Sequence, residues 1–241
     1  MSLSANLLYY GDNLDVLRRH VKDESVDLVY LDPPFNSNRD YNVIFADKSG
    51  EKSEAEIVAF EDSWRWGEES QRAYEWLAQS AVNKGAVSTP VSRMIGSFYA
   101  TLGTNDVMAY LVMMTPRLLE MHRVLKPSGS LYLHCDPAAS HYLKIVLDQV
   151  FGPTNFRREI IWRSGWVSGF KAAVKNWVRN HDTLLYYVKD IKAPPYFNKA
   201  TAYTPHGPDY KRRGGGENPK GVALVLIRVG GVGCRRASLG P

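Results

Sequence analysis

The sequence has little cysteine and no long hydrophobic run. Only two cysteines occur among 241 residues, Cys135 and Cys234, which excludes a framework of several disulfides and is typical of a reducing compartment. The first residues, MSLSANLLYYGD, lack the basic start and the apolar core of a signal peptide. No uninterrupted apolar stretch approaches the roughly 18 residues that a membrane-spanning helix needs. We therefore expect a cytoplasmic protein with no membrane partner.

Acidic residues are scarce in the second half of the chain. Residues 1–120 carry 11 Lys and Arg against 18 Asp and Glu, whereas residues 121–241 carry 19 against 7. The net charge of +5 therefore conceals a basic C-terminal half. Such an asymmetry indicates a polyanionic partner. A solvated basic surface with a basic tail explains the charge by itself equally well.

Hydrophobic patterning predicts an α/β fold. Hydrophobic residues make up 44% of the chain, which is enough to build a sizeable core. Short apolar runs predict strands at residues 7–10, 26–31, 130–135, 158–162 and 182–188. Apolar residues at helical spacing predict helices at residues 13–24, 105–125 and 140–152. The alternation of strands and helices predicts a sheet that is mostly parallel.

Two segments interrupt this alternation. Residues 36–105 are polar and rich in glycine and serine, with an aromatic stretch, EDSWRWGEESQRAYEWLAQS. We interpret them as a loop followed by one or two helices, inserted after the strand at residues 26–31. After residue 190 the chain becomes rich in proline and glycine, a composition typical of loops and linkers. The chain therefore divides into a core region, residues 1–190, and a basic tail, residues 191–241.

The tetrapeptide Asp32-Pro33-Pro34-Phe35 directly follows the strand predicted at residues 26–31. In an open α/β sheet, ligands bind beyond the C-terminal ends of the strands. Asp32 offers a carboxylate acceptor, the prolines leave carbonyl oxygens without a competing N–H, and Phe35 offers a face for stacking of a planar base. Together these groups suit an exocyclic amino group on a flat heterocycle. A simple turn that ends the strand is the alternative.

Four blocks of the sequence resemble the amino-group DNA methyltransferases of the β arrangement. In order, they are GDNLDVLRRHVKDESVDLVYLDPPF, RVLKPSGSLYLHCD, HYLKIVLDQVFGPTNFRREIIW and NHDTLLYYVKD. The resemblance covers residues 7–190 and extends to the adenine-N6 modification subunits of restriction–modification systems. It implies a Rossmann-like fold, S-adenosylmethionine as methyl donor, and double-stranded DNA with a flipped-out target base as substrate. A restriction subunit or a second copy of the chain is the implied protein partner.

The resemblance also implies roles for individual residues. Asp32 and the carbonyl of Pro33 would bind the N6 amine, with Pro34 in the same catalytic loop, and Phe35 would stack on the flipped base. Asp12 would lie near the adenosine end of the cofactor. The DPPF form of the loop favours adenine over cytosine, with the N4 amine of cytosine as the alternative target.

Two further groups of residues are candidates for binding. Six basic residues among aromatic ones predict contacts with DNA phosphates: Arg157, Arg158, Arg163, Lys171, Lys175 and Arg179. A solvated basic face is the alternative. His134, Cys135 and Asp136 are potential metal ligands, but successive residues of a strand point to opposite faces and cannot all reach one ion. We therefore predict no metal site. The resemblance instead implies that these residues end the strand next to the catalytic one and line the pocket.

The chain departs from the family at its C-terminal end. The family's cofactor-binding motif, D-x-F-x-G-x-G, does not occur, and VLIRVGGVG has glycines without the acid or the aromatic residue. Without the strands around that motif, the strand at residues 7–10 loses its neighbour and the strand at 26–31 becomes an exposed apolar edge.

The change to basic, glycine-rich sequence after about Val222 predicts a truncated or frame-shifted end. Residues 191–241 are then either the start of a target-recognition region or an aberrant C terminus. A non-catalytic DNA-binding fragment is the alternative to an active enzyme.

Overall fold

The computed structural model describes residues 7–9, 11–33, 65–163, 175, 177–178, 180–193 and 195. The elements in chain order are α1 (Asn13–His20), β1 (Val26–Leu31), α2 (Glu68–Ala78), α3 (Ser80–Asn83), α4 (Thr89–Leu102), α5 (Asp106–Val124), β2 (Leu125–Cys135), α6 (Pro137–Phe151), the 3₁₀ helix η1 (Pro153–Asn155), β3 (Phe156–Arg163) and β4 (His181–Val188). This mixture of helices and strands confirms the α/β class.

The described strands form one sheet in the order β1-β2-β4-β3. β1 and β2 are parallel, with Leu31 beside Leu133. β4 is antiparallel to β2 and also to β3. The prediction of a mostly parallel sheet is therefore wrong for these strands. The reason is that β4 lies between β2 and β3 and runs against both of them.

Among the described strands, β1 lies at one edge of the sheet, as expected, and β3 lies at the other. The apolar side chains of β1 are nevertheless covered on one face, since Val29 and Leu31 are buried. The strand predicted at residues 7–10 does not form over residues 7–9, where Leu7 and Leu8 are 73% and 89% exposed. Tyr10 lies outside the described residues. A strand needs a hydrogen-bonded neighbour, and none of the described strands pairs with residues 7–9.

Side-chain caps explain where two of the predicted helices begin. Asp12 Oδ1 accepts a hydrogen bond from the N–H of Leu14 at 2.8 Å, at the start of α1. Asn105 Oδ1 accepts one from the N–H of Met108 at 2.9 Å, at the start of α5. The described part of the predicted insertion, residues 65–105, contains α2, α3 and α4, one helix more than expected.

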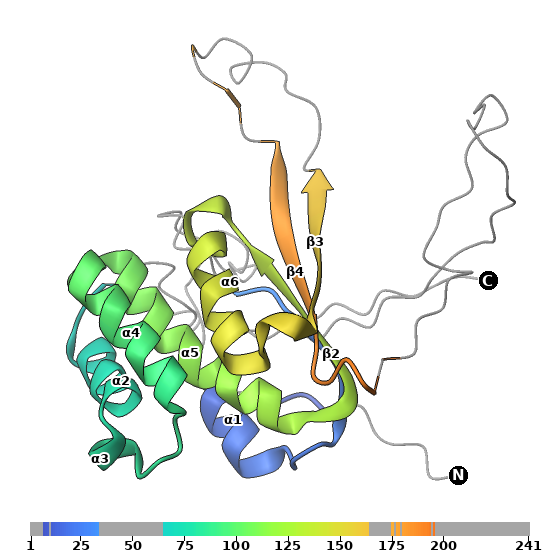
Figure 1. Cartoon of the computed structure of the whole chain (residues 1–241), viewed down its shortest axis with the longest axis horizontal. Helices are drawn as coiled ribbons and strands as arrows, with labels where there is room; N and C mark the ends of the chain where they lie inside the picture. The colour runs from blue at the N-terminus through green and yellow to red at the C-terminus, as the bar shows by residue number, and fades with distance from the viewer. Residues whose placement is uncertain are drawn as a thin grey trace, which may run out of the picture.

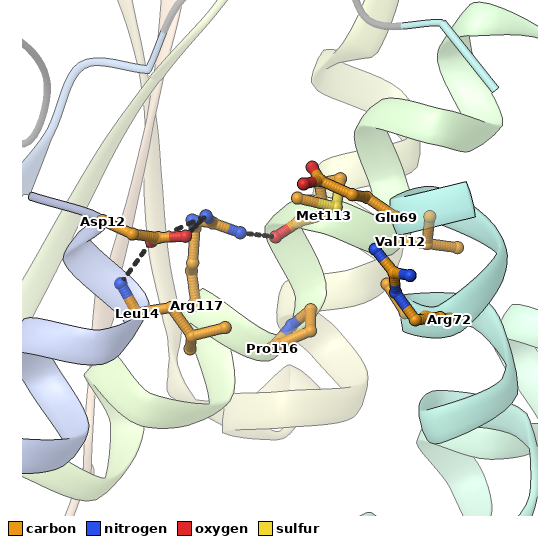
Figure 2. Close-up of a pocket in the computed structure, with 9 residues that line it drawn as sticks. Asp12, Leu14, Glu69, Arg72, Val112, Met113, Pro116 and Arg117 are labelled. Carbon is orange, nitrogen blue, oxygen red and sulfur yellow. Dashed lines mark hydrogen bonds and ion pairs between the residues drawn. The ribbon is translucent and has the colours of Figure 1, made fainter. Parts of the chain in front are cut away.

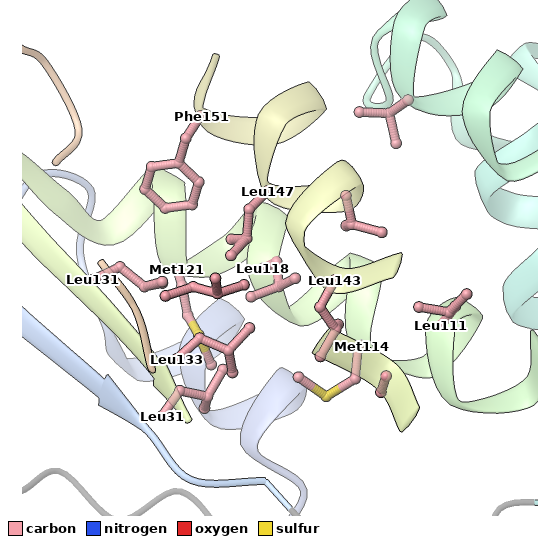
Figure 3. Close-up of a cluster of buried hydrophobic side chains, with 14 of the residues drawn as sticks. Leu31, Leu111, Met114, Leu118, Met121, Leu131, Leu133, Leu143, Leu147 and Phe151 are labelled. Atoms are coloured by element: carbon pink, nitrogen blue, oxygen red, sulfur yellow. The ribbon is translucent and has the colours of Figure 1, made fainter. Parts of the chain in front are cut away.

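The described helices gather on one side of the sheet, while β3 and β4 extend beyond them (Figure 1). α6 contacts both β2 and β4. Between the helices and the sheet lies the hydrophobic core (Figure 3). Its labelled members come from β1, β2, α5 and α6 and are at most 4% exposed: Leu31, Leu131, Leu133, Leu111, Met114, Leu118, Met121, Leu143, Leu147 and Phe151. None of the helices in these ranges is long and apolar enough to span a membrane.

The other face of the sheet carries a row of tyrosines. Tyr30 pairs in register with Tyr132, and Tyr132 pairs with Tyr186. The rings of Tyr132 and Tyr186 stack with their centroids 4.4 Å apart. Since side chains alternate along a strand, Asp32 and His134, two residues further along β1 and β2, belong to this same face.

Candidate active site

Asp32 lies at the C-terminal end of β1, where it meets the end of the parallel neighbour β2. The pairing of Leu31 with Leu133 brings Asp32 beside His134. The side chain of Asp32 is 38% exposed, so its carboxylate is accessible to a ligand while still supported by the sheet. Pro33 follows and is buried. Pro34 and Phe35, the other two members of the predicted catalytic loop, lie outside the described residues.

His134 stands between two carboxylates. Its Nδ1 lies 3.0 Å from Oδ1 of Asp32, and its Nε2 lies 3.7 Å from Oδ2 of Asp182. The hydrogen bond to Asp32 raises the pKa of His134 above its ordinary value, burial lowers it, and the charges of Asp32 and Asp182 raise it further. The net direction is upward, which favours the imidazolium form between two negative charges.

Sequence reasoning missed Asp182. It placed His134 at the end of the strand next to the catalytic one, as a residue that lines the pocket, but it gave no contact between His134 and Asp32. Asp182 could not have been found, because the chain was expected to form a mostly parallel sheet. A residue near the start of a parallel strand would lie at the opposite end of the sheet from Asp32. β4 is antiparallel to β2, so its first residues lie at the same end as the last residues of β1 and β2.

The neighbours of His134 in sequence serve other purposes. Cys135 is fully buried in the core, and burial raises the pKa of its thiol. Asp136 caps α6, with Oδ1 accepting hydrogen bonds from the N–H groups of Ala138 at 2.8 Å and Ala139 at 3.2 Å. The described ranges contain no group of three or more possible metal ligands.

Asp12, the predicted cofactor-binding residue, is held by Arg117 of α5. The Nη2 of Arg117 donates to both carboxylate oxygens of Asp12, at 2.9 and 3.0 Å, and its Nε donates to Oδ1 of Asn13 at 2.7 Å. A fourth hydrogen bond, from Nη1 of Arg117 to the carbonyl of Met113 at 2.6 Å, fixes the guanidinium (Figure 2). Asp12 therefore ties α1 to α5 through an arginine that is only 12% exposed.

A cavity of about 190 Å³ adjoins this ion pair, between α1, α2 and α5 (Figure 2). Sites that enclose drug-sized ligands have volumes of roughly 300–1,000 Å³. Among the described residues the cavity is smaller than such sites, and both carboxylate oxygens of Asp12 accept hydrogen bonds from Arg117. These described residues do not by themselves form a site for S-adenosylmethionine, and the role of Asp12 towards the cofactor stays a prediction.

The predicted DNA-binding residues are only partly within the described ranges. Arg157, Arg158 and Arg163 lie on β3, an edge strand whose residues from Arg158 onward are exposed. Lys175 is also exposed, and Lys171 and Arg179 lie outside the described residues. Trp162 of β3 is 61% exposed and pairs in register with Asp182. The exposed arginines of β3 therefore lie along an edge of the sheet that ends on the same side as Asp32.

Comparison with known proteins identifies a family for this arrangement. A family model described as DNA methylase matches residues 26–223. The chain is 24% identical over 189 residues to the type III restriction-modification enzyme EcoP15I Mod subunit of Escherichia coli, which covers 78% of this chain and 24% of that subunit. It is 28% identical over 163 residues to the StyLTI Mod subunit of Salmonella typhimurium, covering 66% of this chain and 20% of that one.

A type II relative matches over more of the chain. The type II methyltransferase M.BamHI of Bacillus amyloliquefaciens is 28% identical over 229 residues, covering 90% of this chain and 38% of that enzyme. The chain thus spans about a fifth to two fifths of the length of these relatives.

Proposed function

Because the chain belongs to the DNA methylase family, we propose that it contributes to the transfer of a methyl group to the N6 amine of adenine in double-stranded DNA. The observation that supports this most is the position of Asp32: a half-exposed carboxylate at the C-terminal end of β1, followed by the donor-free Pro33. The target base is flipped out of the duplex, since its amino group is otherwise inaccessible inside the stack.

Asp32 and Pro33 act on the amine by accepting its hydrogens. The carboxylate oxygen of Asp32 accepts one N–H and the carbonyl of Pro33 accepts the other. An amine held by both hydrogens directs its lone pair away from these acceptors, towards an electrophilic carbon. S-adenosylmethionine, when bound, would supply that carbon as its methyl group. The methyl–sulfur bond would break as the new nitrogen–carbon bond forms, S-adenosylhomocysteine would leave, and the amine would release one proton to water. A complete site for this donor needs groups beyond the described residues, so we assign no contact to it here.

The N4 amine of cytosine is the second candidate target. It presents the same two N–H donors as the N6 amine of adenine, so the described acceptors fit both. The DPPF form of the loop favours adenine by resemblance. A non-catalytic DNA-binding fragment remains the alternative function, because the small cavity at Asp12 leaves the donor site incomplete within the described residues.

Two measurements on the 241-residue chain test the proposed function. We expect saturable binding in a calorimetric titration of the chain with S-adenosylmethionine. We also expect N6-methyladenine among the nucleosides of double-stranded DNA that has been incubated with the chain and S-adenosylmethionine. N4-methylcytosine in place of N6-methyladenine would change the assigned base. DNA binding without any binding of S-adenosylmethionine would establish the non-catalytic fragment instead.

The exposed arginines of β3 contact DNA phosphates in this proposal. Replacing Arg158 or Arg163 singly by glutamine is expected to weaken DNA binding about equally for all sequences. Each lost phosphate contact should reduce the slope of log K against log salt concentration by about 1. The matched control is Arg72→Gln on α2, whose exposed side chain pairs with Glu68 at 3.5 Å. An unchanged slope in both β3 variants would show that these arginines are only a solvated surface.

The partner in a restriction–modification system is also part of the proposal. The names of the type III relatives describe them as Mod subunits, that is, components of a larger enzyme. We infer by analogy that this chain associates with a restriction subunit or with a second copy of itself. Size-exclusion chromatography coupled to light scattering distinguishes a self-associated chain from a monomer.

A further inference from the structure

The cluster formed by Asp32, His134 and Asp182 is built on three neighbouring strands. Asp32 follows β1, His134 is the penultimate residue of β2, and Asp182 is the second residue of β4. The side chains of His134 and Asp182 are 18% and 20% exposed, less than the 38% of Asp32. Asp32 is therefore the most accessible member of the cluster, and the other two are more deeply buried.

A carboxylate at the end of a strand needs support if it is to bind an amine in one orientation. The side chain of Asp32 can rotate about two bonds, and each rotation moves both oxygens. A hydrogen bond at Oδ1 fixes these rotations and leaves Oδ2 available to a ligand. Nδ1 of His134 lies 3.0 Å from Oδ1, which is a hydrogen-bonding distance. Groups held by strands define such a geometry more sharply than groups held by loops.

We propose that His134 is a positioning residue for Asp32, with Nδ1–H donating to Oδ1 so that Oδ2 faces the amino group of the target base. The inference rests on the proposed function for its substrate, and on the contacts within the cluster for its geometry. His134 touches neither base nor donor in this scheme and acts only through Asp32.

Asp182 favours the protonated form of the imidazole, in which Nδ1–H can donate to Asp32. The Oδ2 of Asp182 lies 3.7 Å from Nε2 of His134, so a carboxylate faces each ring nitrogen. If His134 were neutral with its proton on Nε2, Nδ1 would turn a lone pair towards Asp32. A proton on Nδ1 is retained in the imidazolium form, which the two carboxylates favour. Of the other titratable residues on this face, Tyr30, Tyr132 and Tyr186 lie one row away, on β1, β2 and β4.

Two substitutions separate the two ends of the imidazole. The side-chain amide of asparagine places an N–H donor near the position of Nδ1, whereas that of glutamine places one near Nε2. His134→Asn therefore keeps a hydrogen-bond donor to Asp32 but loses the contact with Asp182. His134→Gln keeps a donor near Asp182 but loses the hydrogen bond to Asp32. With DNA as substrate, we expect kcat to fall about 10²-fold in His134→Gln, because a misplaced reacting group costs about that much. We expect His134→Asn to restore most of kcat, with KM for DNA unchanged in both variants.

A larger loss of kcat in His134→Asn than in His134→Gln would overturn the inference. If both variants lost kcat equally, or if only KM changed, His134 would not act by orienting Asp32. Equal and full activity of both variants would also exclude the role. Circular dichroism and the unfolding midpoint of each variant identify a loss that is due to misfolding.

A nuclear magnetic resonance titration of the full chain gives a result that does not depend on methyl transfer. The ring signals of His134, assigned by their loss in His134→Asn, should titrate above the ordinary histidine value of about 6.5. Asp32→Asn should move that titration downward, whereas Asp27→Asn, on the exposed part of β1, should not. An ordinary titration in the unsubstituted chain, unchanged in Asp32→Asn, would overturn the inference. Absence of methyl transfer with an intact Asp32-dependent titration would instead count against the proposed function.

Discussion

Replacing Asp32 by alanine is expected to abolish methyl transfer while DNA binding stays nearly intact. Asp32 is the exposed acceptor of the cluster, and the proposed mechanism requires it to hold one hydrogen of the target amine. Removing a single well-placed hydrogen-bonding group from an active site typically costs about 10²–10³ in kcat. Loss of the carboxylate removes both this contact and the partner of His134, so we expect the loss to reach at least the upper end of that range.

The matched control is Asp27→Ala in the same strand. Asp27 is 76% exposed and pairs with Lys126 at 2.7 Å, at the other end of β1 from Asp32. It should keep full activity, because an exposed ion pair contributes little to stability and Asp27 lies outside the cluster. Methyl transfer should be measured together with DNA affinity for both variants. Persistent transfer in Asp32→Ala would disprove the catalytic assignment, and a parallel loss of DNA binding would indicate a structural role.

Replacing Leu118 by alanine is expected to lower the free energy of unfolding by about 2–5 kcal/mol. Leu118 lies on α5 and is 0% exposed, within the cluster that joins α5 and α6 to the sheet (Figure 3). The substitution removes buried apolar atoms and leaves a cavity, because close-packed neighbours relax only partly. Such a change is a large fraction of the stability of an ordinary domain.

Leu8→Ala is the control for this prediction. It makes the same chemical change at a side chain that is 89% exposed, so the effect should stay within about 0.5 kcal/mol. Urea unfolding of the two variants and the unsubstituted chain, followed by circular dichroism, measures the difference. Similar midpoints for Leu118→Ala and the unsubstituted chain would show that α5 does not pack against the sheet as described.

Local signals in the sequence were enough to predict most of the described elements. The apolar run at residues 26–31 forms β1, and the run at residues 182–188 lies within β4. Helix α5 begins directly after its cap Asn105, within the helix predicted at residues 105–125. Capping and periodicity depend on residues a few positions apart, so they are visible without the fold. The helices of the inserted segment were counted less well, because its polar, glycine-punctuated composition gives weak periodicity.

The order of strands in the sheet was not predictable in the same way. A strand at residues 7–10 has the right composition, yet Leu7 and Leu8 remain exposed and form no strand. A strand is stabilised by hydrogen bonds to a neighbour that is distant in sequence, and composition does not reveal whether that neighbour is present. The same limit explains why the sheet was expected to be mostly parallel.

By itself the sequence determined that a carboxylate would follow a buried strand, at Asp32, and that the chain resembles the DNA methyltransferases. Only the tertiary structure decided what surrounds that carboxylate. The parallel pairing of β1 and β2 brings His134 to it, and the antiparallel placement of β4 brings Asp182 to the far side of the same imidazole. The physical reason is that strand direction and register are set by long-range backbone pairing and by burial of one face of the sheet, and no local pattern of residues encodes them.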